Sequence, residues 1–197
     1  MCYITGGRPE GATKNYIGCT NKTPPKKEKT IKIPHDLYFA KRSSIWENGG
    51  VAFIKSEKNE QFKTLGRMYL ITDEQFISVV RQENARLPED KTIDIDFEKT
   101  MADGQSMIND GWYRRIIYLG KRDEYPIFTF TGGWKDAEIE LNPPGERYLK
   151  TIIKGIIEAY DLDSNYILRY LVSMMGIKGF IDTERLIKWI QYVEFSR

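Results

Sequence analysis

The feature that most constrains the fold is a strand–turn–helix pattern over residues 66–84, GRMYLITDEQFISVVRQEN. The apolar run Met68–Ile71 follows Gly66 and predicts a short strand that enters a core. Thr72 is followed three residues later by Gln75, which is the signature of a capping box at the start of a helix. The pattern therefore predicts a buried strand connected by a tight turn to an amphipathic helix.

Glu83 is predicted to share the inward face of this helix with apolar side chains. Phe76, Val79, Val80 and Glu83 fall at positions i, i+3, i+4 and i+7, which lie on one helical face. A carboxylate on that face must be paired, hydrogen-bonded or protonated, because an isolated buried charge is very costly. Burial also raises a carboxyl pKa, which suits a Glu to transfer protons near neutral pH. The structural alternative is an ion pair with an arginine such as Arg86.

Composition and charge narrow the class of protein. The 197 residues are 41% hydrophobic, 13% aromatic and 29% charged, a composition that supports a folded core. The 30 basic and 28 acidic residues give a net charge of +2, so charge does not direct the whole protein to nucleic acid. No apolar run reaches the roughly 18 residues of a membrane span, and residues 1–11 contain no signal-peptide core. A cytoplasmic protein without nucleic-acid or membrane partners is expected.

Few side chains are suited to metal binding. Cys2 and Cys19 have neither CxxC nor metal-site spacing, and His35 is the only histidine. The acidic residues that alternate over 94–98 lack the glycine and terminal glutamate of an EF-hand loop. We therefore expect no metal site.

The order of elements predicts an α+β fold, with strands first, one helix among them and helices at the end. Short β-forming runs lie at 31–33, 37–40, 51–54, 112–119 and 127–131. The acidic residues Asp94, Asp96 and Glu98 are expected to lie in a loop or on the solvated face of a strand. Apolar residues at helical spacing lie within 146–160, 165–175 and 184–195.

Two glycines, Gly49 and Gly50, directly precede the strand predicted at 51–54. Paired glycines at such a position let another group approach the backbone closely. That group is either a ligand or a neighbouring strand, and the sequence leaves both alternatives open.

Three motifs stand in an order that resembles a known family. Residues 46–52, WENGGVA, are similar to an aromatic–x–Gly–Gly–aliphatic–Ala start of a central strand, with one additional residue before the glycines. Residues 66–83 are similar to a strand, polar turn and helix ending in Gln-Glu. Pro143-Pro144 is followed by Tyr148, by Ile152 or Ile153, by Gly155, and then by Asp161-Leu162 and Tyr166, which is similar to a Pro-rich turn and a Tyr–x–x–x–Ile–x–x–Gly helix. Together, over roughly residues 36–172, they resemble the γ-glutamylcyclotransferase-like (AIG2-like) family.

The resemblance implies a small mixed β-barrel with flanking and C-terminal helices. The implied domain is 1–172, followed by a C-terminal helical extension over 173–197. Family members begin with a strand and a Tyr-Gly-Ser-Asn loop that holds the γ-glutamyl group, and this sequence contains no such motif. The implied domain is therefore N-terminally incomplete, either because the start is truncated or because the segment is lost.

The resemblance also implies a reaction without a cofactor. In the family, the α-amine of a γ-glutamyl compound attacks its own γ-carbonyl and releases 5-oxoproline with an amine or amino acid, a lyase-type step of glutathione metabolism. The implied roles are general acid and base for Glu83 and substrate binding for Gly49 and Gly50. The expected partner is a small γ-glutamyl substrate, and a homodimer is left open. The alternative is a non-catalytic small-molecule-binding or protein-interaction module.

Overall fold

The computed structural model describes residues 2–196 and divides them into two compact units. Unit 1 contains residues 2–9, Asn15–Lys29 and Met68–Lys135. Unit 2 contains Glu10–Lys14, Thr30–Arg67 and residues 136–196. The chain passes several times between the units, so each unit is assembled from segments that are distant in sequence.

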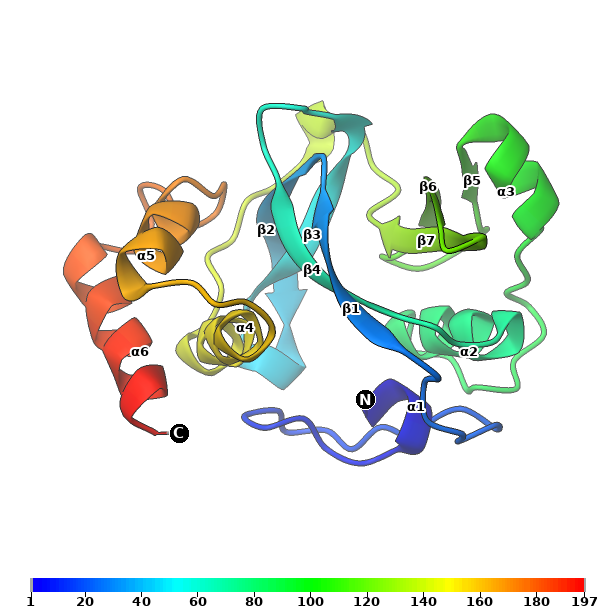
Figure 1. The fold of residues 1–197 in the computed structure, drawn as a ribbon, viewed down its shortest axis with the longest axis horizontal. Coiled ribbons are helices and arrows are strands. Elements are labelled where there is room, and N and C mark those ends of the chain that lie inside the picture. The colour runs from blue at the N-terminus through cyan, green and yellow to red at the C-terminus, as the bar shows by residue number, and fades with distance from the viewer. Residues whose placement is uncertain (1, 197) are drawn as a thin grey trace. The chain divides into compact units, whose positions relative to one another are not determined.

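Unit 1 combines a three-stranded antiparallel sheet with three helices (Figure 1). Its elements are α1 (Cys2–Thr5), α2 (Asp73–Glu83), α3 (Phe97–Asp103), β5 (Gln105–Met107), β6 (Arg115–Arg122) and β7 (Tyr125–Thr131). The hairpin from β6 to β7 turns at Asp123 and Glu124, whose φ angles are 50° and 67°. Positive φ at both central residues fits the twist of the flanking strands.

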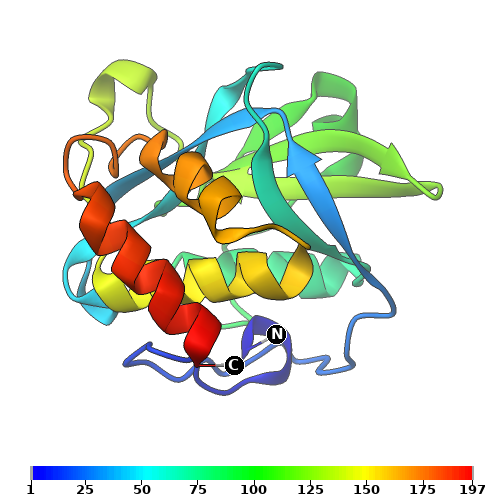
Figure 2. The ribbon, with the colours of Figure 1, turned by 60° about the vertical axis from the view of Figure 1, so that its left-hand side comes forward.

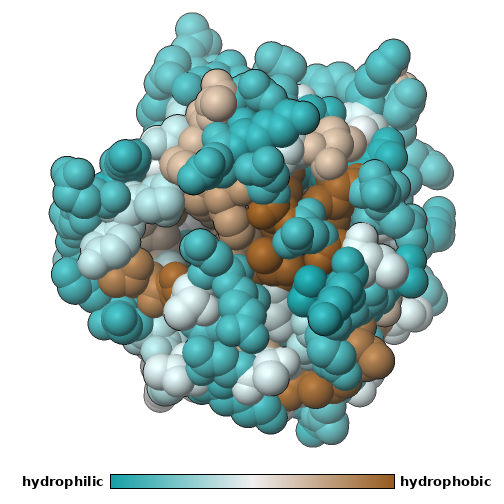
Figure 3. Space-filling view, turned by 90° about the vertical axis from the view of Figure 1, so that its right-hand side faces the viewer, coloured by the Kyte–Doolittle hydropathy of each residue, from teal (hydrophilic) through white to brown (hydrophobic). Residues whose placement is uncertain are grey.

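The core of unit 1 joins α2 to its sheet. Val80 and Ile116 are fully buried in a cluster of aliphatic side chains. The ring of Phe76 lies 5.8 Å from Phe97 and 6.0 Å from both Phe128 and Phe130, measured between ring centroids. These rings are only partly buried, and apolar surface remains accessible on the face shown in Figure 3, bordered by hydrophilic side chains.

Unit 2 contains two strand pairs and three long helices. Its strands are β1 (Glu28–Ile33), β2 (His35–Ser43), β3 (Gly49–Lys58) and β4 (Thr64–Tyr69), of which the first and last extend by two residues into unit 1. Its helices are α4 (Glu146–Ala159), α5 (Ser164–Val172) and α6 (Thr183–Phe195), with 3₁₀ turns η1 (Ser44–Trp46) and η2 (Asp136–Glu138). β2 pairs with β3 in antiparallel register, and β1 pairs with β4.

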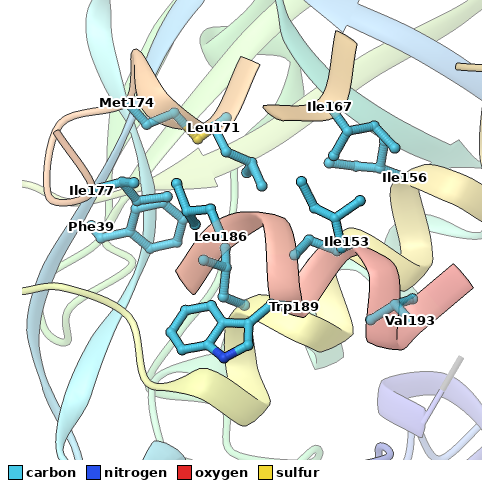
Figure 4. Close-up of a cluster of buried hydrophobic side chains, with 12 residues drawn as sticks. Phe39, Ile153, Ile156, Ile167, Leu171, Met174, Ile177, Leu186, Trp189 and Val193 are labelled. Atoms are coloured by element: carbon cyan, nitrogen blue, oxygen red, sulfur yellow. The ribbon is translucent and has the colours of Figure 1, made fainter. Parts of the chain in front are cut away.

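The helices of unit 2 pack together over Phe39 of β2 (Figures 2 and 4). The side chains that are fully buried in this core come from all three helices, β2 and the α5–α6 connection: Phe39, Leu149, Ile153, Ile167, Leu171, Met174, Ile177, Leu186 and Ile190. Fully burying one such side chain contributes about 1.5–3 kcal/mol. The predicted boundary between a domain that ends at residue 172 and a C-terminal extension that starts at residue 173 stays a prediction. Within unit 2, α6 shares one apolar core with α4 and α5.

The predicted α+β class is confirmed, whereas a closed barrel is not observed. The strands described within residues 2–196 form three separate sheets. β2 does not continue into a third strand, because its further backbone contacts are isolated bridges from Ala40 to Leu141 and from Tyr38 to Met175. The longest helix in this range, α4 with 14 residues, is too short to cross a bilayer, and no other described helix qualifies.

The prediction for Asp94, Asp96 and Glu98 is wrong in part, because Glu98 lies inside α3, whereas the other two precede this helix. Asp96 begins α3 by accepting a hydrogen bond from the N–H of Lys99 at 2.9 Å, and Gly104 ends it with a φ of 77°. A helix of seven residues is too short to give a clear apolar periodicity, so its caps were the only signal in the sequence.

Gly49 and Gly50 allow the chain at Asn142–Gly145 to approach β3. The N–H of Gly50 donates a hydrogen bond to the carbonyl of Pro143 at 2.8 Å. A Cβ atom on Gly50 would lie 2.0 Å from the Asn142 carbonyl oxygen, and one on Gly49 would lie 2.3 Å from the Gly145 nitrogen. The group that approaches these glycines closely is therefore another backbone segment of the same chain. Their predicted role in substrate binding stays a prediction.

We predict that Gly50→Ala lowers the free energy of unfolding by about 3 kcal/mol, because the new methyl group forces two backbone segments apart. Gly155→Ala is the matched control, since that residue lies inside α4 and a Cβ added there would meet no atom within 4 Å. The control should be stabilised by about 0.5–1 kcal/mol. Urea unfolding measures both. Equal stability of Gly50→Ala and the wild type would contradict the close-approach explanation.

Candidate functional site

Glu83 is the last residue of α2 and lies half-buried in unit 1. The predicted capping box fixes the start of this helix. Thr72 Oγ1 accepts a hydrogen bond from the N–H of Gln75 at 3.2 Å, and Gln75 Oε1 accepts one from the N–H of Thr72 at 3.1 Å. The predicted inward face is also present, because Val80 is buried and Phe76 packs among aromatic rings two turns before Glu83.

Two tyrosines of the N-terminal segment meet Glu83. The hydroxyl groups of Tyr3 and Tyr16 are hydrogen-bonded at 2.9 Å, and their ring centroids are 4.2 Å apart. The Tyr3 hydroxyl also hydrogen-bonds to the Glu83 carboxyl group. The carboxyl group thus lies beside a pair of packed phenol rings.

Burial is the main influence on the acid–base behaviour of this cluster. It raises the pKa of Glu83 to about 7, although the hydrogen bond from Tyr3 opposes the shift. The pKa of Tyr3 is raised far above its ordinary value by burial and by the nearby Glu83 charge, and burial also raises the pKa of Tyr16. At neutral pH both phenols therefore keep their protons, whereas Glu83 changes its charge.

The expected alternative, an ion pair between Glu83 and Arg86, does not form. Arg86 pairs instead with Asp110 at 2.5 Å. No ion pair found within residues 2–196 includes Glu83. In this part of the chain, the half-buried carboxyl group is hydrogen-bonded by the Tyr3 hydroxyl and is not paired with a cation.

The amide of Gln82 positions Tyr3 beside Glu83. Gln82 Nε2 donates hydrogen bonds to the carbonyls of Tyr3 at 2.8 Å and Ser78 at 3.3 Å. Gln82 Oε1 accepts a hydrogen bond from the N–H of Gly18 at 3.1 Å. A single buried side chain thereby holds two N-terminal segments of the chain against α2.

The N-terminal residues, for which the sequence predicted no helix or strand, are closely packed. Gly7 and Tyr16 exchange two backbone hydrogen bonds, at 3.0 and 2.7 Å. Gly18 has a φ of 86°, and a Cβ there would lie 2.5 Å from the nitrogen of Gly6. Glycine is therefore required where these two segments meet.

One feature of the sequence indicated this packing, a row of polar residues along one face of α2. Gln75, Ser78 and Gln82 fall at i, i+3 and i+7, and all three are buried. Gln75 Nε2 donates hydrogen bonds to the carbonyls of Asn21 at 3.0 Å and Thr23 at 2.8 Å. Buried amides on one helical face indicate that a chain segment with exposed backbone groups packs there.

The other predicted site residues lie elsewhere. Gly49 and Gly50 belong to unit 2, whereas Glu83 belongs to unit 1. Within residues 2–196, no group of three or more His, Cys, Asp or Glu side chains is arranged to hold a metal ion. His35 is buried, and its Nδ1 lies 2.8 Å from the carbonyl of Lys55.

Comparison with known proteins identifies one named relative. The chain is 34% identical over 170 residues to histone deacetylase 5 of Arabidopsis thaliana, an alignment that covers 80% of this chain and 26% of that protein. The chain thus spans about a quarter of the length of the relative. No family model matches the chain, and no solved structure matches it.

This relative corrects the functional expectation. A histone deacetylase points away from a γ-glutamylcyclotransferase that forms 5-oxoproline, so the predicted activity is wrong. The associated transferase and lyase classes and the place in glutathione metabolism are withdrawn with it. The geometry at Glu83 remains, and it requires a different explanation.

We predict that the stability of unit 1 falls as pH rises through neutrality. Because the folded protein holds the Glu83 proton more tightly than the unfolded chain does, the stabilisation is full below about pH 4.5 and is lost as pH rises through about 7. The loss relative to Glu83→Gln should be about 3 kcal/mol in the free energy of unfolding. Urea unfolding from pH 4.5 to pH 8 measures it.

The control is Glu98→Gln, which changes an exposed carboxylate in the first turn of α3. This variant should keep the decline of the wild type with rising pH. If Glu83→Gln and the wild type followed parallel pH profiles, Glu83 would have an ordinary pKa and the interpretation of its environment would be incorrect.

Proposed function

We propose that unit 1 is a ligand-binding module that recognises an ammonium group at Glu83, as part of the function of proteins related to histone deacetylases. The observation that carries the proposal is the half-buried carboxyl group, which no ion pair within residues 2–196 neutralises. Its neighbours are the Tyr3 and Tyr16 phenols. A cation at this position would neutralise the ionised carboxyl group.

An ammonium group satisfies the electrostatics of this site. A positive charge near Glu83 favours the ionised carboxyl group and lowers its pKa from about 7. Hydrogen bonds between charged groups are stronger than those between neutral groups. The Tyr3 hydroxyl, which hydrogen-bonds to the carboxyl group, can also accept a hydrogen bond from the ammonium group.

The relative suggests lysine as the source of the ammonium group. Its name describes removal of acetyl groups from histones, and deacetylation restores a charged amine on a lysine that was neutral when acetylated. We therefore propose that this chain binds the deacetylated form of a histone lysine. The chain is assigned binding alone, and the hydrolytic step is assigned to regions of the relative outside the matched quarter.

We also propose that the elements follow the fold type of the γ-glutamylcyclotransferase-like proteins without that family's reaction. The support is the order of the three motifs. The glycine pair begins β3, the strand–turn–helix motif forms β4 and α2, and the Pro-rich turn leads into α4. Shared fold types commonly carry different functions.

The proposed binding predicts a strong preference for unmodified lysine. Isothermal titration of the full chain should show at least about tenfold tighter binding of a lysine-containing histone-tail peptide than of the same peptide with every lysine acetylated. Affinity for the unmodified peptide should rise about tenfold from pH 6 to pH 8, because ionised Glu83 becomes the main form. Butylammonium should compete for the same site.

Glu83→Gln should abolish the preference for unmodified lysine, whereas the exposed Glu98→Gln should retain it. Equal binding of the acetylated and unmodified peptides by the wild type would contradict lysine recognition. Unchanged binding by Glu83→Gln would show that the ammonium group is held elsewhere.

A further inference from the structure

The segment 22–29 of unit 1, KTPPKKEK, combines two prolines with a run of lysines. Its four lysines and one glutamate give it a net charge of +3. Every residue of the segment except Pro25 is exposed, and β1 begins only at Glu28. The side chains of this segment are therefore accessible to another protein.

Thr23, in this segment, is held by its backbone and not by its side chain. Its N–H donates a hydrogen bond to Asn21 Oδ1 at 3.0 Å, and its carbonyl accepts one from Gln75 Nε2 at 2.8 Å. Within residues 2–196, no hydrogen bond to the Thr23 hydroxyl group is found. The fold does not use this exposed hydroxyl group, so it is free to react.

Two prolines keep the backbone around Thr23 extended. Pro24 disfavours the helical conformation at Thr23, and Pro25 does the same at Pro24. Residues 22–25 accordingly adopt neither a helix nor a turn. A protein kinase binds its substrate as an extended segment, so this conformation reduces the entropic cost of binding.

The residues that follow Thr23 indicate one class of kinase. Pro24 has no backbone N–H, so a pocket without a hydrogen-bond acceptor for it selects proline over other residues. Lys26 lies three residues after Thr23, where an acidic group of the kinase can pair with it. In the 197 residues, Thr23 is the only serine or threonine that directly precedes a proline. The sequence thus offers a single site to a proline-directed kinase.

We propose that Thr23 is a phosphorylation site for a proline-directed kinase that uses ATP as the phosphoryl donor. Thr23 Oγ1 forms the new bond to the γ-phosphorus, the bond from that phosphorus to the ADP oxygen breaks, and a carboxylate of the kinase takes the hydroxyl proton. The phosphate adds about −1.5 to −2 charges, so the net charge of residues 22–29 falls from +3 to about +1. The proposal does not depend on ligand binding at Glu83.

The test is incubation of the full chain with a cyclin-dependent kinase in complex with its cyclin and with Mg-ATP, followed by mass spectrometry. One addition of about 80 Da should appear, and fragmentation should place it on Thr23. Thr23→Ser should still be phosphorylated. Thr23→Ala should remain unmodified and keep its melting temperature, because the hydroxyl group makes no hydrogen bond. An unmodified wild type, or phosphate on another residue, would overturn the assignment.

Two matched pairs of variants test the recognition pattern. Pro24→Ala should lower the initial rate of phosphorylation at least about tenfold, whereas Pro25→Ala should change it less than about twofold. Lys26→Ala should lower the rate at least about threefold, whereas Lys27→Ala should change it less than about twofold. Equal rates for the two proline variants would overturn the assignment to a proline-directed kinase. Equal rates for the two lysine variants would overturn the role of Lys26.

Discussion

The buried amide of Gln82 is the interaction on which unit 1 depends. It hydrogen-bonds to the Tyr3 carbonyl, the Ser78 carbonyl and the Gly18 N–H, which come from three parts of the chain. Loss of one buried partner costs about 1–3 kcal/mol. These bonds place Tyr3 beside Glu83 and hold the backbone at Gly18 against α2.

Glu83 occupies a position that is unfavourable for a carboxylate. It lies in the last turn of α2, where the helix dipole presents its negative end, and burial already raises its pKa to about 7. Arg81, in the same turn, has the favourable sign of charge at this end. A helix optimised only for stability would carry a neutral or basic residue at 83, so the carboxyl group indicates a requirement other than folding.

Helices and strands could be predicted from local sequence patterns, whereas the contacts between segments that are distant in the sequence could not. The capping box of Thr72 and Gln75 depends on neighbouring residues, and the sequence identified it. By contrast, the bond between Gln82 and the Tyr3 carbonyl joins residues 79 positions apart. Nothing in the spacing of Tyr3 and Tyr16 indicated that they meet Glu83. The predicted barrel likewise stays a prediction, because strand pairing between distant segments cannot be read from any one stretch of sequence.

The predicted cyclotransferase activity was wrong because most residues of its motifs are required by the fold and do not specify a reaction. Gly49 and Gly50 are explained by the backbone at Asn142–Gly145, and Gln82 by the segment it holds. Residues with a complete structural explanation carry little information about a ligand, since they would be needed for any ligand on the same scaffold. Glu83 alone among them lacks a structural partner that neutralises its charge, and the information it carries is a preference for a cation. A charge preference restricts the ligand but does not specify a reaction, so proteins with different activities can share the motif.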